Sequence, residues 1–425
     1  MTQRPVPPVA AMRPHAVTSP HGERIDDYYW LRDDTRTAPE VLAYLTAENA
    51  YRDAATAALR PLEDTLYGEI VGRIRQDDST VPYRDHGYWY YRRFDTGDEY
   101  PLYARRAGAS DGPEQVLLDL RAQAPGLDYY DIGALEVSDD NRLLAYTEDT
   151  VGRRQHTLRF KRLETGDLLP DAVPNVEEGM AWAADNRRVL YVEKDPVTLL
   201  GLRVRVHELG TDPAADRLLY EEPDESFYTA VELTKDRRYL LIHSSSTVTT
   251  EIRYARADDP ALEFRVLLPR KRGHEYDVEH VDGRWIIRTN WQARNFRIME
   301  APVGAAADRR QWRELLGHRD DVFIAGFDVF RDFLAVEERS EGLRKVRIRP
   351  WQGTRDFYLD SDEPAYRMAL SANEEMDSDV VRYTYTSLTT PHTTYDYDVR
   401  TGARTLLKQE PVLGEFDPSR YATEY

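Results

Sequence analysis

The sequence has no cysteine among its 425 residues, which excludes disulfide bonds and thiolate chemistry. It also has no apolar run that approaches the roughly 18 residues of a membrane-spanning helix. The N-terminal stretch MTQRPVPPVAAMRPHAV contains no continuous apolar segment with a small-residue cleavage site. We therefore expect a cytoplasmic protein with no membrane partner.

An excess of basic residues is missing as well. Asp and Glu number 76 and Lys and Arg 57, which gives a net charge of −19. Nucleic-acid binding depends on Lys and Arg neutralising phosphates, so this charge argues against nucleic-acid partners. It favours cationic ligands such as basic peptides, although acidic surface that merely keeps a protein soluble is the more ordinary interpretation. The 28 tyrosines and 7 tryptophans favour extensive β-structure.

Helix-spaced apolar residues occur only near the N-terminus. One segment runs from Pro39 to about Leu59 and a second from Pro61 to about Arg75. Each repeats apolar residues on one face and places proline in the first turn, where its missing N–H loses no partner. We predict two helices within an N-terminal segment of residues 1–76.

A turn centred on aspartate, followed by a strand, recurs through the rest of the chain. The intervals between these turns are roughly 45 to 55 residues, and repeats of that size with about four short strands are typical of propeller blades. Hairpin signals such as Thr165-Gly166 and Thr401-Gly402 fit the same pattern. The sequence predicts an all-β, seven-bladed β-propeller over residues 77–411. A tandem of β-sandwiches is the alternative, which the regular period disfavours. The aspartates are Asp85, Asp140, Asp185, Asp236, Asp282, Asp332 and Asp379.

Two stretches look chemical when taken alone. Gly108–Gly112 matches the G-x-S-x-G pattern of hydrolase nucleophiles, but a helix should follow the serine. Here Pro113 and another strand follow, so we interpret Ser110 as part of a hairpin loop. His274-Glu275 and His280 are spaced too widely for two metal ligands one helical turn apart. The sequence therefore predicts no catalytic residue, no metal site and no cofactor in this chain.

Several stretches resemble the prolyl oligopeptidase family, and within it oligopeptidase B. The N-terminal PHGERIDDYYWLRDDTR, residues 20–36, carries the resemblance most clearly. Further similar stretches follow in the same order and together cover essentially the whole chain. They are KDPVTLLG (194–201), PRKRGHEYDVEH (269–280), VEERSEGL (336–343) and YTSLTTP (385–391).

The resemblance implies a serine peptidase whose propeller precedes an α/β-hydrolase domain with a Ser-Asp-His triad. On this basis residues 412–425 would begin the linker to that domain, which lies outside these 425 residues. Acyl transfer needs nucleophile, base and oxyanion donors together, so we do not expect this chain to hydrolyse peptides alone. The complete enzyme would cleave short peptides after Arg or Lys, with the propeller gating access and residues 75–80 and 411–415 acting as hinges.

The resemblance also implies two gating residues at the domain interface, Asp128 and Arg154. The family commonly has Glu at the first of these positions, and an ordinary salt bridge within one blade is the competing interpretation. Two hypotheses remain for the whole chain. It is either the front part of such a peptidase, or a stand-alone propeller that binds peptides or a partner protein. The apolar faces expected on the two helices favour the first, because a stand-alone propeller would leave them uncovered.

Overall fold

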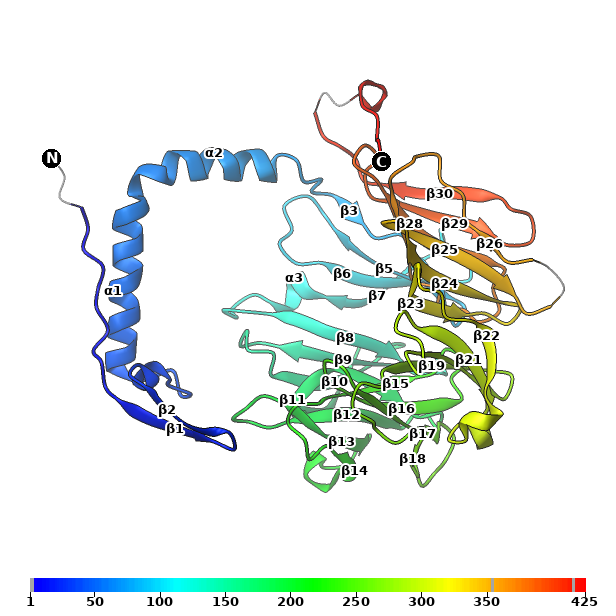
Figure 1. Cartoon of the computed structure of the whole chain (residues 1–425). Coiled ribbons are helices and arrows are strands. Elements are labelled where there is room, and N and C mark those ends of the chain that lie inside the picture. The colour runs from blue at the N-terminus through cyan, green and yellow to red at the C-terminus, as the bar shows by residue number, and fades with distance from the viewer. Residues whose placement is uncertain (1–3, 353–354, 415–416) are drawn as a thin grey trace. The chain divides into compact units, whose positions relative to one another are not determined.

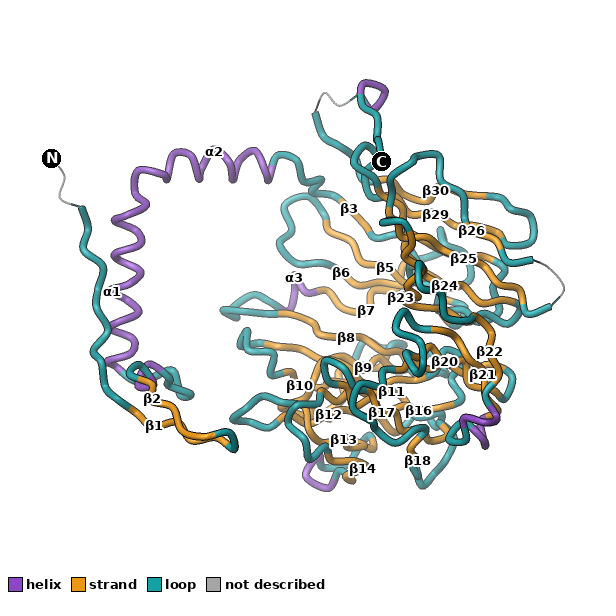
Figure 2. Tube along the Cα trace, viewed as in Figure 1, coloured by secondary structure: helices purple, strands orange, loops and turns teal. Residues whose placement is uncertain are grey.

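The computed structural model describes residues 4–352, 355–414 and 417–425. The chain divides into two compact units, residues 1–75 and 76–425. In the first unit a hairpin of β1 (His15–Ser19) and β2 (Gly22–Asp26), which the sequence had not indicated, precedes α1 (Pro39–Thr56) and α2 (Arg60–Val71). Figure 2 shows that the long helices belong to this unit and the strands mainly to the second. In the part of the chain that the structure describes, five short 3-10 turns flank helices or strands elsewhere: Tyr29–Leu31, Pro213–Ala215, Val303–Ala305, Arg309–Gln311 and Pro418–Arg420.

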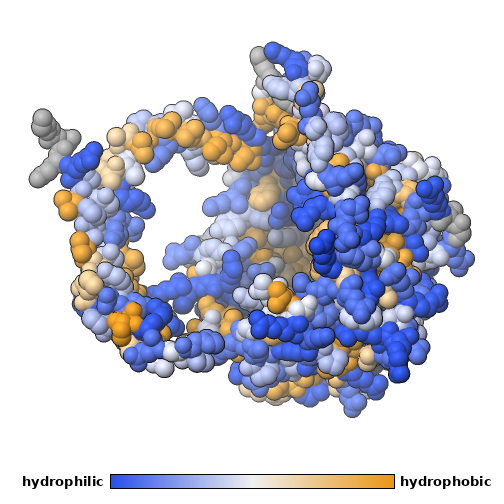
Figure 3. Space-filling model, viewed as in Figure 1, coloured by the Kyte–Doolittle hydropathy of each residue, from blue (hydrophilic) through white to orange (hydrophobic). Residues whose placement is uncertain are grey.

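The two helices form where the sequence predicts them, joined by a 3-10 turn at Ala57–Leu59. Proline lies in the first turn of each. The second helix ends at Val71, short of the predicted Arg75, because the chain tightens into three-residue hydrogen-bonded turns. Most of the apolar side chains on both helices are exposed. Figure 3 shows hydrophobic residues at the surface of this unit. The most exposed on the helices are Leu45, Leu62, Tyr67 and Ile70, and Leu59 in the turn and Ile74 after α2 are exposed as well.

The described part of the second unit forms seven blades, as predicted. Blade 1 contains β3 (Asp78–Ser79), β4 (Tyr83–Asp85), β5 (Tyr88–Phe94), β6 (Leu102–Ala107) and β7 (Glu114–Asp119), and α3 (Leu120–Gln123) follows it. Blade 2 contains β8 (Asp131–Val137), β9 (Leu143–Asp149), β10 (His156–Arg162) and the first part of β11 (Leu168–Trp182). Blade 3 contains the last part of β11, β12 (Arg188–Lys194), β13 (Gly201–Glu208) and β14 (Arg217–Glu221).

The remaining blades follow in chain order (Figure 1). Blade 4 contains β15 (Tyr228–Leu233), β16 (Tyr239–Ser245), β17 (Thr250–Arg256) and β18 (Arg265–Val266). Blade 5 contains β19 (Tyr276–Val281), β20 (Arg284–Thr289), β21 (Arg297–Pro302) and β22 (Arg313–Leu316). Blade 6 contains β23 (Val322–Val329), β24 (Phe333–Ser340), β25 (Leu343–Pro350) and β26 (Phe357–Tyr358). Blade 7 contains β27 (Arg367–Leu370), β28 (Val380–Thr386), β29 (Thr393–Asp398) and β30 (Arg404–Gln409).

The predicted aspartate turns connect the first and second strands of the blades. The carboxylate of Asp185 accepts the backbone N–H of Arg187 at 2.9 Å, and that of Asp236 accepts the Thr234 hydroxyl at 2.8 Å. In several blades the residue after the aspartate has a positive φ, for example 57° at Asn186 and 58° at Arg237. We call the face of the ring that carries these turns the aspartate-turn face.

Successive blades are joined by apolar clusters, and the seam between blades 1 and 7 differs. Six clusters of buried side chains link blade 1 to blade 2 and so on to blade 7 within the described residues. At the seam the contacts are polar. Lys408 Nζ donates to the carbonyl of Ser79 at 2.9 Å, and Arg382 Nη1 donates to that of Pro82 at 2.6 Å. Among the described strands, none is shared by the sheets of blades 1 and 7, so side chains close the ring.

The segment after blade 7 contacts blades 6 and 7. The Thr423 hydroxyl lies 2.8 Å from that of Thr389, and the Tyr425 hydroxyl donates to the carbonyl of Glu341. Residue 415, the end of the second predicted hinge, lies outside the described residues. No helix in the described part of the chain is both long and apolar enough to cross a membrane.

Candidate functional site

A cavity of about 930 Å³ occupies the axis of the propeller. Blades 1, 2, 3, 4 and 7 supply its walls, mainly through their innermost strands and the aspartate turns. Tyrosines and Trp182 form part of the wall, while charged side chains gather toward the aspartate-turn face. We call this cavity the axial chamber.

Arg237 extends across the axis from blade 4. Its Nη2 lies 2.9 Å from Asp85 Oδ2 of blade 1, and its Nη1 lies 2.9 Å from Asp139 Oδ1 of blade 2. Burial alone would lower the pKa of Arg237, but the charge of Asp85 and its hydrogen bond, with Asp139, raise it. One guanidinium therefore connects three blades, two of which are not neighbours of its own.

Lys235 of the same turn reaches in another direction. Its Nζ donates to Asp328 Oδ1 of blade 6 at 2.7 Å and lies 3.8 Å from the centre of the Phe330 ring. The ammonium is thus held by a carboxylate and by an aromatic face, which attracts cations through its quadrupole. Burial raises the pKa of Asp328, although Lys235 opposes the rise.

Two carboxylates in the axial chamber have no cation within ion-pair distance among the described residues. These are Glu136 of blade 2 and Glu374 of blade 7, and both face water in the chamber while protein surrounds them. Burial raises the pKa of Glu136 to about 7, with Arg237 opposing and Asp85 and Glu374 adding to the rise. Burial also raises the pKa of Glu374.

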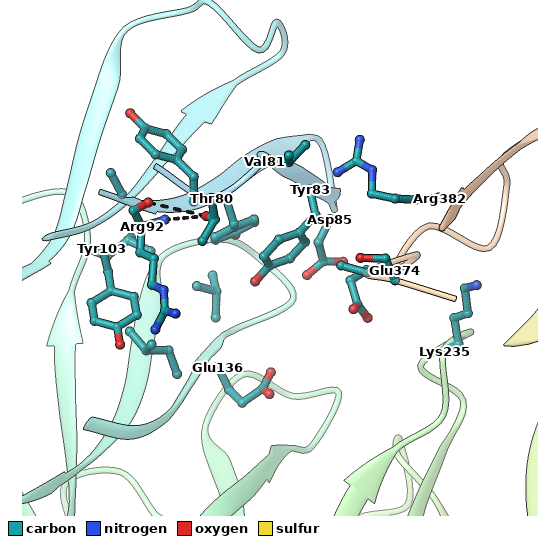
Figure 4. Close-up of a pocket in the computed structure, with 18 of the residues that line it drawn as sticks. Thr80, Val81, Tyr83, Asp85, Arg92, Tyr103, Glu136, Lys235, Glu374 and Arg382 are labelled. Carbon is teal, nitrogen blue, oxygen red and sulfur yellow. Dashed lines mark hydrogen bonds between the residues drawn. The ribbon is translucent and has the colours of Figure 1, made fainter. Parts of the chain in front are cut away.

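Figure 4 shows the side chains of Tyr83, Asp85, Glu136 and Glu374 directed toward one shared space, with Lys235 at its edge. Burial, followed by the charges of Glu374 and Glu136, raises the pKa of the Tyr83 phenol. The arrangement provides negative charge and aromatic surface, a combination that suits cationic groups. In the described residues the Ser19 hydroxyl accepts a hydrogen bond from the backbone N–H of His21, but no serine hydroxyl is paired with a histidine ring as a serine–histidine nucleophile requires.

The residues that the resemblance singled out lie apart from this chamber, in two loops of blade 2. Asp128 is exposed in the loop before β8, and Arg154 is exposed in the loop between β9 and β10. The two loops touch, since a Cβ on Gly152 would lie 3.2 Å from the Tyr129 ring. In the described residues neither Asp128 nor Arg154 forms an ion pair with the other or with a third residue. The backbone N–H of Arg154 donates to Asp149 Oδ2 at 2.7 Å, which fixes the loop.

The serine and the two histidines that the sequence analysis considered for catalysis or metal binding lie in a turn or in hydrogen bonds within the propeller. Ser110 is exposed in the turn between β6 and β7, which confirms the hairpin interpretation. His274 Nε2 lies 2.9 Å from the Thr289 hydroxyl, and His280 Nδ1 lies 2.5 Å from Asp236 Oδ2. Within the described residues no group of three His, Cys, Asp or Glu side chains could hold a metal ion.

The sequence analysis missed the charged residues of the axial chamber. One signal was available, because Arg237 follows its aspartate where Asn141 and Asn186 follow theirs in blades 2 and 3. Glu136 and Glu374 carried no comparable signal. Acidic residues near strand ends are common, and their convergence depends on closure of the ring.

Seven blades around an acidic axial chamber, preceded by a helical unit, define the chain as a β-propeller with an N-terminal extension. Residues 8–410 match the family model described as prolyl oligopeptidase, N-terminal beta-propeller domain. The chain therefore belongs to the prolyl oligopeptidase family and corresponds to its N-terminal and propeller regions.

Individual relatives agree with this assignment. The chain is 50% identical to dipeptidyl aminopeptidase BI of Pseudoxanthomonas mexicana and 32% identical to protease 2 of Moraxella lacunata, each over 98% of its length. It spans only 60% of either relative. The structure of oligopeptidase B from Leishmania major superposes with a TM-score of 0.91 at 28% identity, covering 99% of this chain and 63% of the other.

Proposed function

We propose that this chain is the propeller part of a serine oligopeptidase that cleaves short peptides, with the propeller restricting which peptides reach the catalytic centre. The family match over residues 8–410 carries the proposal. A ring with a narrow axial chamber excludes folded proteins by size, which supports a gating role.

The substrate class that we propose is basic peptides, cleaved after Arg or Lys. The similarity to oligopeptidase B at a TM-score of 0.91 supports this specificity, as do the net charge of −19 and the acidic chamber. A second candidate is removal of dipeptides from a free N-terminus. It is favoured by the relative with 50% identity, which is named a dipeptidyl aminopeptidase.

The proposed partner of the propeller is an α/β-hydrolase domain that carries the serine, acid and histidine. Exposed apolar side chains on α1 and α2 support it, because water-exposed apolar faces favour association. More such side chains lie in loops between the second and third strands of blades, on the face opposite the aspartate turns. These are Val151, Val197, Val248 and Leu388. We propose that Asp128 and Arg154 contact the hydrolase domain at this face.

The test begins with the native product in source cells, detected with an antibody against the propeller. A band well above 49.3 kDa that a serine-directed fluorophosphonate labels would support a peptidase. The 425-residue chain, which should stay unlabelled, is the control. A band at 49.3 kDa without labelling would contradict the proposal and favour a stand-alone propeller that binds peptides or a partner.

Substrate choice needs a separate assay with the native product. Matched peptides with Arg, Lys or Gln before the cleaved bond, each with a free or acetylated N-terminus, separate the two candidates. Cleavage of the acetylated Arg and Lys peptides supports oligopeptidase B-like action. Loss of cleavage on acetylation supports dipeptide removal, since that reaction needs the free amino group. We also propose a cytoplasmic location, which cell fractionation tests.

A further inference from the structure

Two cavities meet at the aspartate-turn face. The axial chamber lies on the inside, and a smaller cavity of about 260 Å³ lies outside it, lined by turn residues of blades 1, 4, 5, 6 and 7. Four residues line both cavities: Asp85, Lys235, Arg237 and Glu374. These four charged residues therefore lie between the inside of the ring and its outer mouth, and we call them the partition.

The partition is held by bonds that cross the axis. Arg237 of blade 4 contacts Asp85 of blade 1 and Asp139 of blade 2, each at 2.9 Å. Lys235 contacts Asp328 of blade 6 at 2.7 Å. Charge-assisted hydrogen bonds are shorter and stronger than neutral ones, and the Arg237 side chain is only 23% exposed. Both cations come from one turn, so a single three-residue segment spans the mouth.

Arg237 is the central member of this partition. Its backbone φ of 58° belongs to the left-handed region, which an asparagine occupies at the matching place in blades 2 and 3. An asparagine side chain is too short to reach across the axis, whereas the guanidinium forks between carboxylates on two blades. Within the described residues, the Arg237 side chain has hydrogen bonds only to Asp85 and Asp139.

We propose that the Arg237 side chain closes the axial chamber at the aspartate-turn face, and we call this closure the bolt. The propeller is then closed at this face and is not an open pore. A peptide can enter from this face only when the guanidinium leaves Asp85 and Asp139. The closure stands on the side-chain geometry alone, and its consequence for substrate access rests on the proposed function.

Cross-linking through the partition tests the bolt. Because the chain has no cysteine, thiols can be placed without background. Val137→Cys lies in the axial chamber and Arg238→Cys in the outer cavity, and neither residue lines both. A series of bis-maleimides with increasing spacer length is applied, and the intramolecular cross-link is measured by mass spectrometry. A spacer that cannot pass between the sites gives an effective concentration near zero.

We expect the cross-link to form at least about tenfold faster in Arg237→Ala than with Arg237 present. The matched control is Arg331→Ala, which removes a salt-bridged arginine that lines only the outer cavity and should leave the rate unchanged. The pair Arg238→Cys and Glu375→Cys, both in the outer cavity, should cross-link in every background. Equal rates with and without Arg237, or the same acceleration in Arg331→Ala, would overturn the bolt.

A fold check accompanies each variant by circular dichroism. If Arg237→Ala does not fold, the double variant Asp85→Asn with Asp139→Asn releases the guanidinium and is measured in the same way. Cross-linking then supports the bolt, and its absence overturns it. Neither reading depends on peptide cleavage, so failure of the bolt and failure of the proposed peptidase function are distinguishable.

Discussion

The ammonium of Lys408, in the last strand of the propeller, lies 2.7 Å from Oδ2 of Asp78, in the first. This pair helps to close the seam between blades 7 and 1. The other blade junctions are held by shared apolar clusters instead. Both side chains are about one-quarter exposed, so solvent screens the attraction only partly. The pair therefore ties together chain segments separated by more than 300 residues.

Replacing Lys408 by Met should weaken the seam. We expect the free energy of unfolding to fall by about 1 kcal/mol, since the change leaves a half-buried carboxylate without its cation. Amide hydrogen exchange should also rise selectively in β3, β5, β28 and β30. Lys345→Met is the control, because its partner Glu341 is largely exposed and the expected loss is below about 0.5 kcal/mol. Equal effects of the two variants would show that the seam pair has no special role.

Gly133, in the innermost strand of blade 2, should not tolerate a side chain. A Cβ there would lie 2.7 Å from the Thr147 hydroxyl and 3.0 Å from both Glu178 Cγ and His156 Nε2. Gly133→Ala should cost about 1–3 kcal/mol of stability through overpacking. At Gly179 nothing lies within 4 Å of such a Cβ, so Gly179→Ala should change stability by less than about 0.5 kcal/mol. Urea unfolding measures both, and similar losses would refute the close packing at Gly133.

His207 should make blade 3 more stable at lower pH. Its fully buried ring lies 2.9 Å from Asp216 Oδ1 and 3.1 Å from Asp171 Oδ1. Burial alone would lower the pKa of His207, but hydrogen bonds to Asp216 and Asp171 outweigh it and raise the pKa above 6.5. Because the folded pKa exceeds the unfolded one, the stabilisation is complete below the unfolded pKa and is lost as pH rises through the folded pKa.

The measurement compares the wild-type chain with His207→Gln by urea unfolding between about pH 6 and pH 9. The stability difference should be greatest at the acidic end and decrease steadily toward the alkaline end. A difference that stays constant, or that increases with pH, would contradict the assignment of a charged imidazole.

Arg154→Ala tests the proposed domain contact in the complete enzyme. Because the side chain has no ion-pair partner within the described chain, its loss should leave propeller stability within about 0.5 kcal/mol. If it contacts the hydrolase domain, kcat/KM for basic peptides should fall about three- to tenfold. Arg142→Ala, another exposed arginine of blade 2, should leave turnover unchanged. Unaltered turnover in both variants would remove Arg154 from the gating residues.

The fold was readable from the sequence because its signals are local. An aspartate that binds backbone N–H groups two residues on, as Asp185 does, produces the same turn wherever it occurs. Hairpins at Gly166 and Gly402 need only a positive φ, which glycine adopts without cost. The β1–β2 hairpin was missed because its strands are polar and mostly exposed, so the sequence shows little alternation.

The candidate site was less readable, because its parts come from distant places in the chain. Arg237 and Asp85 are 152 residues apart, and only closure of seven blades brings them within 2.9 Å. The family resemblance pointed instead to Asp128 and Arg154, whose role depends on contacts beyond these 425 residues. Side chains that meet across a ring leave no periodic trace in the sequence.

The residue that follows the turn aspartate has a positive φ in several blades, and its identity differs from blade to blade. His86, Asn141, Asn186 and Arg237 occupy this position in four blades with φ values of 48° to 62°. The His86 and Arg237 side chains line the outer cavity, whereas Asn141 accepts a hydrogen bond from Arg105 and Asn186 accepts one from the backbone N–H of Asp140. A substitution at His86 or Arg237 therefore changes the lining of the outer cavity while the apolar clusters that join the blades stay intact. At these two positions the charge at the mouth of the ring is thus set by side chains that the packing between blades does not use.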